Sequence, residues 1–346
     1  MSAKMNDFDK LINDIENTYG KGTASVPTDV EVIPHPSVGF NVLVGIHGVP
    51  LGKILEFYGP EHGGKTMMAL LAIVNANKEG KRCAFIDLEA ALDKTWAAKL
   101  GVNWELTTYI RPPSGEKAFD IMAKLVQSGF FSLIVFDSVA AIVSEVELKS
   151  EIEDTKDRVG GYAAKIMGAG LRKLVKLLTD HKVAAIFINQ VRDKLGTMYG
   201  ETETTPGGRA LKFYASIRIR VNKLTKKDAV YIEHGIQIGH KCNIRLKKNK
   251  LGAPDARTAE FDLYYETGID QISEIIDWLH ILNLASKRGD TITYENNKYT
   301  LAAFASKLVS DESFKLEMIN KIYQNSRGSS TETVEDEPIT LNEGLE

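Results

Sequence analysis

The sequence predicts an α/β protein whose core is a mostly parallel twisted sheet with helices on both faces. Two observations lead to this prediction. Short runs rich in β-branched and aromatic residues recur, and each is apolar almost throughout, which is typical of strands buried on both faces. Helical segments separate these runs, and such an alternation indicates parallel strands joined by crossing helices. The four runs are Ile54–Tyr58, Cys83–Ile86, Leu133–Phe136 and Ala184–Ile188.

The segments between and after these runs extend the same pattern. The expected helices are Met67–Glu79, Ala91–Leu100, Glu116–Gln127 and Ala163–Leu178. Further along the chain, Ile217–Val221 and His240–Leu246, with the Tyr231–Ile238 run, predict added strands that are antiparallel to the rest.

The N-terminal residues predict one amphipathic helix that ends at Gly20. Its apolar residues recur at intervals of three and four, which places them on one face of a helix. Such a stripe must be buried against something, and two partners remain open: the helix's own domain or a neighbouring subunit. The stripe consists of Met5, Phe8, Leu11, Ile12, Ile15 and Tyr19.

The chain on either side of the expected core has a different composition. Thr23–Pro50 is rich in Pro and Gly and predicts an irregular lead-in. After residue 268 the pattern predicts a helix over Ile272–Leu284, a hairpin around Asn296 and Asn297, and two more helices. Thr331–Glu346 carries six acids and no base, so it predicts a solvated tail or one that competes with an anionic ligand.

Composition and charge narrow the class of protein. The formal net charge is −3, so any nucleic-acid partner would need a local rather than a global positive potential. No stretch of about 18 apolar residues is present, and no transmembrane helix is expected. The only cysteines, Cys83 and Cys242, give no disulfide framework or metal-binding spacing, and a reducing cytoplasm is the expected location.

The segment Gly59–Thr66 is a complete phosphate-binding loop. It has the pattern G-x-x-x-x-G-K-[ST], and it lies between an expected strand and an expected helix. Its glycines allow successive backbone N–H groups to converge on phosphate oxygens, and the helix directs its positive end at them. Lys65 would place an ammonium on the outer phosphates, and the hydroxyl of Thr66 would bind Mg2+. The alternative is an ordinary Gly-rich turn before a helix.

Three polar residues follow strands at the same edge of the expected sheet. Asp137 ends an apolar strand, as expected of the carboxylate that holds Mg2+ through water. Glu89 follows another strand and is a candidate to orient or deprotonate an attacking water; the alternative is a surface carboxylate that caps the next helix. Gln190 ends a third strand and could contact the terminal phosphate or its water, because its amide both donates and accepts.

Two segments without periodicity predict functional loops. Residues 191–209 combine bases, glycines and threonines with one aromatic residue, which suits a phosphodiester backbone and stacking on bases. The alternative is a loop that is merely flexible. Glu151–Val159 is the second such segment, and it precedes a helix that carries Lys165 and Arg172.

The densest basic cluster lies near residue 248. It consists of Arg245, Lys247, Lys248 and Lys250. From the residues alone, three interpretations remain open: a nucleic-acid patch, a solvated strand end, or cations that reach an anion on a neighbouring subunit.

Taken together, these motifs resemble the RecA-type homologous recombinases, over about Gly45 to Gly268 and more weakly at both ends. The resemblance is carried by many short segments in one order. Among them are Gly59-Pro60-Glu61, Cys83-Ala84-Phe85-Ile86-Asp87, Ala91-Leu92-Asp93, Asp137-Ser138-Val139-Ala140-Ala141, Phe187-Ile188-Asn189-Gln190, Glu203-Thr204-Thr205, Gly207-Gly208, Ala210-Leu211-Lys212-Phe213-Tyr214-Ala215-Ser216 and Lys248-Asn249-Lys250.

The resemblance implies an organisation and a function. It implies an N-terminal oligomerisation helix and linker (1–30), a RecA-like P-loop ATPase core (31–268) with DNA loops at about 150–161 and 191–209, a small α/β domain (269–325) and an acidic disordered tail (326–346). It implies an ATP- and Mg2+-dependent filament on single-stranded DNA that pairs with homologous duplex DNA and exchanges strands in repair and recombination. Partners would be other copies of the chain, DNA, and single-strand-binding and loader proteins.

The resemblance also assigns roles to single residues. Glu89 matches the catalytic glutamate, Gln190 the link between ATP and a DNA loop, and Lys65 the lysine of the phosphate loop. The implied ATP contacts are Gly59, Pro60, Glu61, His62, Gly63, Gly64, Lys65, Thr66, Met67, Asp93, Trp96 and Gly268, with Lys248 and Lys250 reaching across from the neighbouring subunit and Thr66 and Asp137 holding the metal. The implied DNA contacts are Arg158, Lys165, Arg172, Arg192, Lys194, Met198, Tyr199, Gly207, Gly208 and Arg209.

Some positions depart from the family pattern, which indicates a divergent member of bacterial or phage origin. Met67 replaces a second threonine, Trp96 replaces a tyrosine, and Gly160 stands where a methionine normally wedges between bases. Two alternatives to a recombinase remain: a ring-forming helicase-type motor on the same core, and an ATP-gated protein that coats DNA without needing Glu89.

Overall fold

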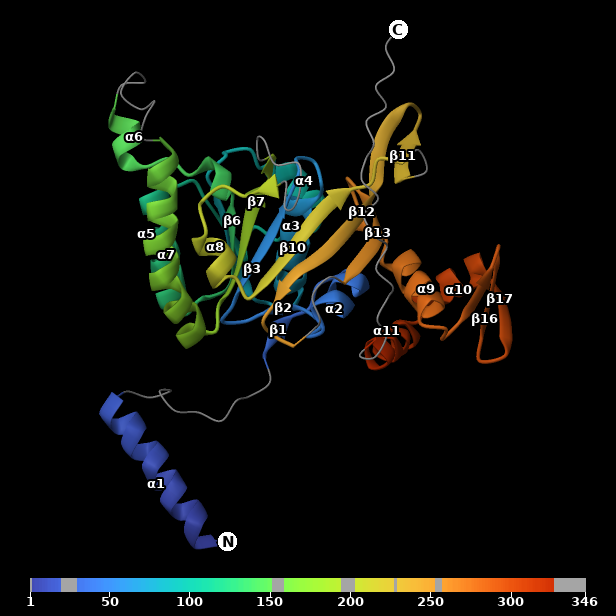
Figure 1. Cartoon of the computed structure of the whole chain (residues 1–346). Helices are drawn as coiled ribbons and strands as arrows, with labels where there is room; N and C mark the ends of the chain where they lie inside the picture. Colours follow the sequence, from blue (N-terminus) through green and yellow to red (C-terminus); the bar gives the residue numbers. More distant parts are fainter. Residues whose placement is uncertain are drawn as a thin grey trace.

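The computed structural model describes residues 2–19, 30–150, 159–193, 203–226, 229–252 and 257–326. A ten-stranded sheet forms the centre of this part of the chain (Figure 1). Its strands are β3 (Ile54–Gly59), β4 (Arg82–Asp87), β5 (Thr107–Ile110), β6 (Phe131–Asp137), β7 (Ala184–Gln190), β10 (Ile217–Lys223), β11 (Val230–Glu233), β12 (Ile236–Asn249), β13 (Thr258–Tyr264) and β14 (Gly268–Ile269). They run in the order β14-β13-β12-β10-β3-β7-β6-β4-β5, with β11 paired to β12. The predicted α/β class is confirmed.

The middle of the sheet is parallel, as predicted. β10, β3, β7, β6, β4 and β5 pair with one another in parallel. β12 then runs antiparallel to β10, and β13 runs antiparallel to β12. The antiparallel orientation predicted for the added strands is therefore right for His240–Leu246. It is wrong for the pairing of Ile217–Val221 with β3, which is parallel. A strand at such a junction has one parallel and one antiparallel partner, and its own sequence does not show on which side each lies.

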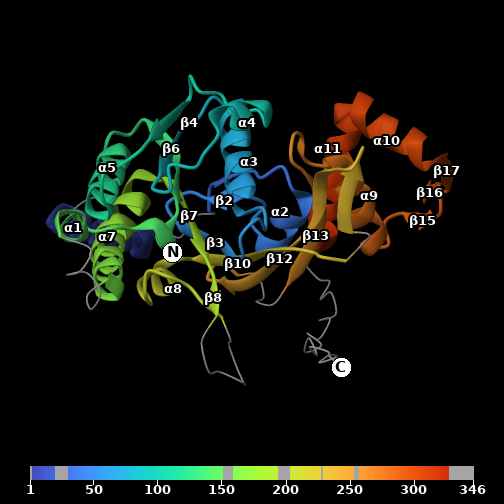
Figure 2. The ribbon, with the colours of Figure 1, turned by 90° about the horizontal axis from the view of Figure 1, so that it is seen from above.

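Each face of the sheet is covered by an apolar layer. α3 (Lys65–Lys78) and α2 (Val38–Val44) belong to one layer, and α5 (Gly115–Gln127), α7 (Val159–His181) and α8 (Ala210–Tyr214) belong to the other (Figure 2). Alternate residues of β3 enter the two layers, Leu55 and Phe57 on the α3 side and Ile54 on the α7 side. This double coverage explains why the central strands are apolar on both faces. Among the described helices, none is long and apolar enough to cross a membrane.

The lead-in before β3 is more regular than predicted. Within the segment expected to be irregular, Val38–Val44 forms the fully buried helix α2. Ser37 caps its first turn by accepting a hydrogen bond from the Phe40 N–H at 2.9 Å, and Gly45 ends it in the left-handed conformation. β1 (Val32–Ile33) and β2 (Val49–Pro50) pair on either side of it. A short helix that is buried all round has no 3.6-residue periodicity, so the sequence pattern could not show it.

The C-terminal elements form the predicted small α/β appendage. They are α9 (Gln271–Ile281), β15 (Ser286–Arg288), β16 (Thr291–Tyr294), β17 (Asn297–Thr300), α10 (Leu301–Ser310) and α11 (Glu312–Ser326). The β16–β17 hairpin turns through Glu295 and Asn296, both with positive φ, one residue earlier than the predicted turn at Asn296 and Asn297. α11 contacts the core through Tyr323, whose hydroxyl accepts a hydrogen bond from Asn41 at 2.8 Å.

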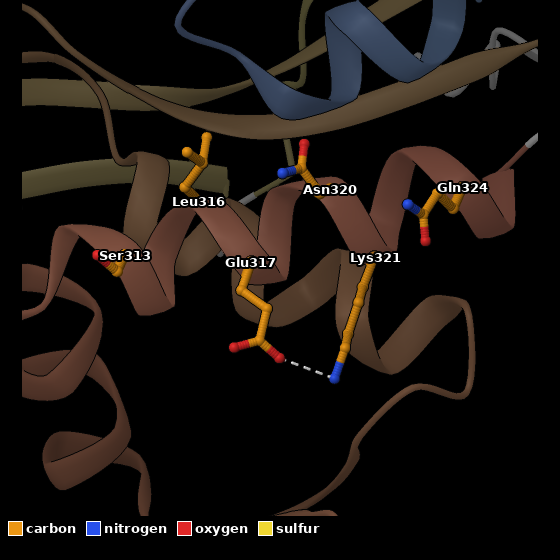
Figure 3. A pocket seen from close by; sticks show the side chains of 6 residues that line it. All are labelled: Ser313, Leu316, Glu317, Asn320, Lys321 and Gln324. Atoms are coloured by element: carbon orange, nitrogen blue, oxygen red, sulfur yellow. Dashed lines mark ion pairs between the residues drawn. The ribbon is translucent and has the colours of Figure 1, made fainter.

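A shallow depression of about 420 Å³ lies on the outer face of α11. Its lining comes from that helix alone: Ser313, Leu316, Glu317, Asn320, Lys321 and Gln324 (Figure 3). Lys321 pairs there with Glu317 at 2.9 Å and with Glu295 at 2.7 Å. The ion pairs already satisfy the charged residues of the depression, and none of its residues belongs to the sheet.

A buried carboxylate joins the appendage to the core. Glu274 of α9 is 3% exposed and accepts hydrogen bonds from the Ser37 hydroxyl (2.6 Å) and from the N–H groups of Val38 (2.9 Å) and Gly39 (2.8 Å). Burial raises the pKa of this carboxyl to about 7, although the three donors favour its ionised form. Glu274 therefore supplies the acceptor that the first turn of α2 needs inside the apolar core.

Replacing Glu274 with Ala is expected to lower the free energy of unfolding by about 2–4 kcal/mol, because buried donors lose their acceptor and a cavity forms. Denaturant unfolding followed by circular dichroism measures the change. Glu312→Ala is the matched control, since that carboxylate pairs with Lys315 on the surface and is 77% exposed; a change within about 0.5 kcal/mol is expected for it. Equal effects of the two substitutions would contradict the role given to Glu274.

Candidate functional site

The phosphate-binding loop has the strand-loop-helix context that the sequence predicted. It leaves β3 at Gly59 and enters α3 at Lys65. Gly59 has φ 153°, and a Cβ built there would lie 2.0 Å from the carbonyl oxygen of Val221, so no other residue fits without moving β10. Gly64 precedes α3 with φ 99°, in the left-handed region that favours glycine. These constraints hold the loop at the N-terminus of α3, where backbone N–H groups suit an anion.

The ammonium group of Lys65 points back toward the start of this loop. Its Nζ donates a hydrogen bond to the carbonyl oxygen of Pro60 at 2.5 Å. Burial lowers the pKa of Lys65, while the charges of Asp137, Glu89 and Glu61 oppose that change. A buried ammonium beside a loop of N–H groups is the arrangement that phosphate oxygens require.

Thr66 and Asp137 face each other beside this loop. The Thr66 hydroxyl donates to Asp137 Oδ2 at 2.9 Å. Burial raises the pKa of Asp137 to about 7, the hydrogen bond from Thr66 lowers it, and the nearby charge of Glu89 raises it further. Two hard oxygen ligands next to a phosphate site fit Mg2+. Among the described residues, no cluster of three His, Cys, Asp or Glu could hold a metal by itself.

The sheet brings the three strand-end residues to one edge. Gly59 is paired with Gln190, and Asp87 with Asp137. Glu89 follows β4 by two residues, and its carboxylate accepts hydrogen bonds from the Ser138 hydroxyl and, at 3.4 Å, from Gln190 Nε2. Glu89, the candidate general base, and Gln190, the candidate contact for the terminal phosphate, therefore lie in direct contact beside the phosphate-binding loop.

Glu89 does not cap the helix that follows it, so that alternative is wrong. The cap of α4 (Lys94–Lys99) is Asp93, which accepts hydrogen bonds from the N–H groups of Thr95 (2.7 Å) and Trp96 (3.2 Å). Asp87 accepts from the N–H groups of Ala90 and Leu92 and so fixes the bend between β4 and α4. α4 therefore begins later than the predicted Ala91, and Glu89 remains available to the site.

The residues expected at the adenine lie near the end of the sheet that carries β13. Trp96 donates its indole N–H to the carbonyl oxygen of Tyr265 at 2.6 Å. The Tyr265 hydroxyl in turn accepts from Gln237 Nε2 at 2.6 Å. Gly268 begins β14 with φ 80° and packs against Leu71 of α3. Sequence reasoning missed Tyr265, for which the signal was a pair of aromatic residues ending a strand.

The second expected DNA loop leaves the sheet directly after Gln190. Its two arms pair as β8 (Arg192–Asp193) and β9 (Glu203–Thr204). On the return arm, Gly207 and Gly208 have φ 83° and 75° and pack against Val139 and Ala164, so close packing already accounts for these glycines. The exposed bases among the expected DNA contacts are Lys165, Arg172, Arg192 and Arg209. Arg158, Lys194, Met198 and Tyr199 lie outside the described residues.

Lys248 and Lys250 lie away from the phosphate-binding loop of their own subunit. Lys248 donates to the carbonyl oxygen of Phe213 at 3.0 Å and Lys250 to the same atom at 3.1 Å, at the C-terminal end of α8. In the sheet, Lys248 of β12 lies opposite Arg218 at the start of β10, whereas Gly59 is at the far end of the neighbouring strand β3. Both ammonium groups are thus at the amino edge of the parallel strands, opposite the edge that carries Glu89 and Gln190.

A buried polar cluster that the sequence did not reveal lies beside the return arm of the second expected DNA loop. Glu56 of β3 is fully buried and accepts hydrogen bonds from Arg218 Nε and, at 3.1 Å, from Asn189 Nδ2. Asn189 Nδ2 also donates to the Pro206 carbonyl oxygen at 3.2 Å. A charged residue inside an apolar strand was the available signal, but its partners are more than a hundred residues away.

The sequence of this chain is similar to those of known proteins. A family model described as the RecA N-terminal domain matches residues 6–270. The chain belongs to the RecA family. Protein RecA of Bacillus subtilis is 41% identical over 304 residues, which are 86% of this chain and 85% of that protein. Protein RecA of Chloroherpeton thalassium is 39% identical over 328 residues (92% and 88%), and that of Porphyromonas gingivalis is 40% identical over 321 residues (90% and 92%).

A crystal structure of the RadB recombinase matches the fold with a TM-score of 0.50 and 21% identity, covering 67% of this chain and 95% of that one. RecA proteins are ATP-dependent recombinases, and as a member of the family this chain is a DNA-dependent ATPase that uses ATP with Mg2+ in recombination and repair. The expected resemblance, activity and cofactors are therefore confirmed. The comparisons assign no role to single residues.

Proposed function

We propose that ATP at Gly59–Thr66 joins adjacent subunits into a helical filament on single-stranded DNA. The filament samples homologous duplex DNA and exchanges strands, and hydrolysis at the subunit interface loosens the joint and releases DNA. Residues 31–268 act as the ATPase core with DNA loops at about 150–161 and 191–209, although 159–161 already belong to α7. Residues 269–325 and 326–346 act as the appendage and the acidic tail. The location is the cytoplasm, of a bacterial cell or of a phage host.

The residues at the carboxyl edge of the sheet have separate roles in the ATPase reaction. Backbone N–H groups of the loop and Lys65 bind the phosphates, and Thr66 and Asp137 hold Mg2+, which when bound neutralises phosphate charge. Glu89 accepts the proton of the attacking water, with the Ser138 hydroxyl fixing its carboxylate. Asp93, Trp96 and Gly268 hold the adenine, with Tyr265 as an added member of that group.

The observation that carries the proposal is the contact between Gln190 and Glu89. Gln190 Nε2 lies 3.4 Å from Glu89 Oε1, and two residues later the chain enters the β8–β9 stem of the second loop. The state of the terminal phosphate can therefore be passed from the water-activating carboxylate to a loop with exposed bases. Through this contact, ATP hydrolysis would depend on DNA and DNA binding would depend on ATP.

Two further observations support assembly through ATP. Lys248 and Lys250 lie at the edge opposite their own phosphate-binding loop, so an ATP that they contact belongs to the next subunit. In α1 (Ser2–Tyr19), Leu11 of the apolar stripe is 57% exposed in the single chain, which favours the neighbouring subunit as its partner.

Electron microscopy tests this function directly. With a non-hydrolysable ATP analogue and single-stranded DNA, the chain is expected to form extended helical filaments that are absent with ADP. Filament formation by Lys65→Ala should fail, because the variant loses the phosphate contact on which the joint depends. Discrete closed rings under the same conditions would instead support a motor, since a ring is the closed form of a head-to-tail interface.

A further inference from the structure

Strand β10 places two arginines on the face of the sheet that carries the second loop. Its apolar residues Ile217, Ile219 and Val221 enter the layer with α3, so Arg218 and Arg220 point to the opposite face. Arg218 binds buried Glu56 and lies over the ring of Tyr58, with its Cζ 4.5 Å from the ring centre. Arg220, two residues on, has a different partner.

Arg220 forms a two-pronged ion pair with Glu203 on the return arm of the loop. Its Nε donates to Oε2 at 3.0 Å and its Nη2 donates to Oε1 at 2.7 Å. The two side chains are 25% and 32% exposed, so water only partly screens them. The pKa of Glu203 is lowered, first by the hydrogen bonds from Arg220 and further by the charges of Arg220 and Lys247. The planar guanidinium of Arg220 faces the planar carboxylate of Glu203, and two parallel hydrogen bonds fix the relative orientation of the groups as well as their distance.

The pair connects two parts of the molecule that the proposed function requires to communicate. Glu203 lies in β9, which pairs with β8, and β8 begins two residues after Gln190. Arg220 is paired in the sheet with Tyr58, the residue before Gly59 of the phosphate-binding loop. A nearby second tie, from Asn189 to the Pro206 carbonyl oxygen, attaches the same arm to β7.

We propose that Arg220 and Glu203 form a latch that holds the β8–β9 stem of the second DNA loop against β10. Strand β10 lies next to β3, which leads into the phosphate-binding loop. The proposal builds on the function proposed above, in which residues 191–209 bind DNA. Arg220 acts through Glu203 and does not itself contact DNA. With its carboxylate partner in place, its donors at Nε and Nη2 are already occupied, and a phosphate would have to break both hydrogen bonds.

The obvious competing interpretation is that Arg220 binds a DNA phosphate, and it predicts the opposite effect of one substitution. If Arg220 were a phosphate contact, Glu203→Gln would remove a competing anion and tighten DNA binding. If the pair is a latch, Glu203→Gln frees the stem and weakens DNA binding as Arg220→Gln does. The salt dependence separates the two cases again, because losing one phosphate contact lowers the slope of log affinity against log salt by about 1.

The test measures ATP hydrolysis of the full chain against the concentration of single-stranded DNA, with affinity measured at several salt concentrations. For Arg220→Gln and Glu203→Gln we expect the half-saturating DNA concentration to rise about threefold to tenfold with an unchanged maximal rate. In the double variant, this concentration should not exceed that of the more strongly affected single variant. The salt slope should stay at the wild-type value. Arg220→Lys, which keeps the charge and loses the two-pronged contact, should fall between the wild type and Arg220→Gln.

Three controls make the result decisive. Arg192→Gln should lower the salt slope, as expected of a phosphate contact. Glu312→Gln, which breaks the surface pair with Lys315, should change nothing, and affinity for a fluorescent ATP analogue should be equal in all variants. Tighter DNA binding by Glu203→Gln, additive single effects, or a wild-type response in both single variants would overturn the latch. If the wild-type chain failed to bind single-stranded DNA, the proposed function would fail first.

Discussion

Glu89→Gln is expected to lower the rate of DNA-stimulated ATP hydrolysis by about 10²- to 10⁴-fold, the usual contribution of a positioned general base. Glutamine keeps the shape of the side chain and can still accept a hydrogen bond from Ser138, but it cannot take a proton from water. Affinity for ATP should stay within about twofold of the wild type, because Lys65, Thr66 and the loop N–H groups remain in place. Steady-state hydrolysis and the binding of a fluorescent ATP analogue measure the two quantities.

The same variant separates recombinases from proteins that only coat DNA. Glu89→Gln should form filaments on single-stranded DNA that persist after ATP is added, because the joint no longer breaks through hydrolysis. Glu105→Gln is the matched control, since that exposed carboxylate lies away from the carboxyl edge of the sheet. Hydrolysis by Glu89→Gln at a rate similar to that of Glu105→Gln would contradict the role given to Glu89.

The sequence was sufficient to predict the centre of the fold and the phosphate site. The central strands are buried on both faces, so their composition does not depend on a particular partner and can be recognised locally. The phosphate-binding loop is equally local, because Gly59, Gly64, Lys65 and Thr66 act within one turn of chain. The strand-end position of Glu89, Asp137 and Gln190 then follows from the rule that parallel strands end at one edge.

What could not be predicted depends on partners that are distant in the chain. Glu274 meets Ser37 at a separation of 237 residues, and Glu56 meets Arg218 at 162. No local pattern connects such residues, and a carboxylate in an apolar run looks the same whether it is paired or not. The direction of β10 was missed for the same reason, since pairing with both β3 and β12 is a property of the assembled sheet. The Arg220–Glu203 pair belongs to this class too.

Replacing both Lys248 and Lys250 with Ala is expected to abolish DNA-stimulated ATP hydrolysis while each subunit stays folded. The two ammonium groups lie at the amino edge of the sheet, so their loss leaves Glu89, Lys65 and Asp137 of the same subunit untouched. Trans-acting cations contribute about 10³- to 10⁵-fold to phosphoryl transfer in comparable sites. Circular dichroism melts should shift little, because the lysines contact carbonyl groups at the exposed end of α8. Lys241→Ala, on the same strand β12, is the matched control.

Mixing two inactive variants shows on which subunit the lysines act. If the lysines act on the neighbouring subunit, each site in a filament combines Glu89 of one subunit with Lys248 and Lys250 of the next, because a head-to-tail interface joins two different surfaces. When the double lysine variant is mixed in equal amounts with Glu89→Gln, about a quarter of the sites pair an intact Glu89 with intact lysines. Hydrolysis should therefore return to roughly a quarter of the wild-type rate. If the lysines acted within their own subunit, every site would lack one component, and the mixture would stay as inactive as its parts.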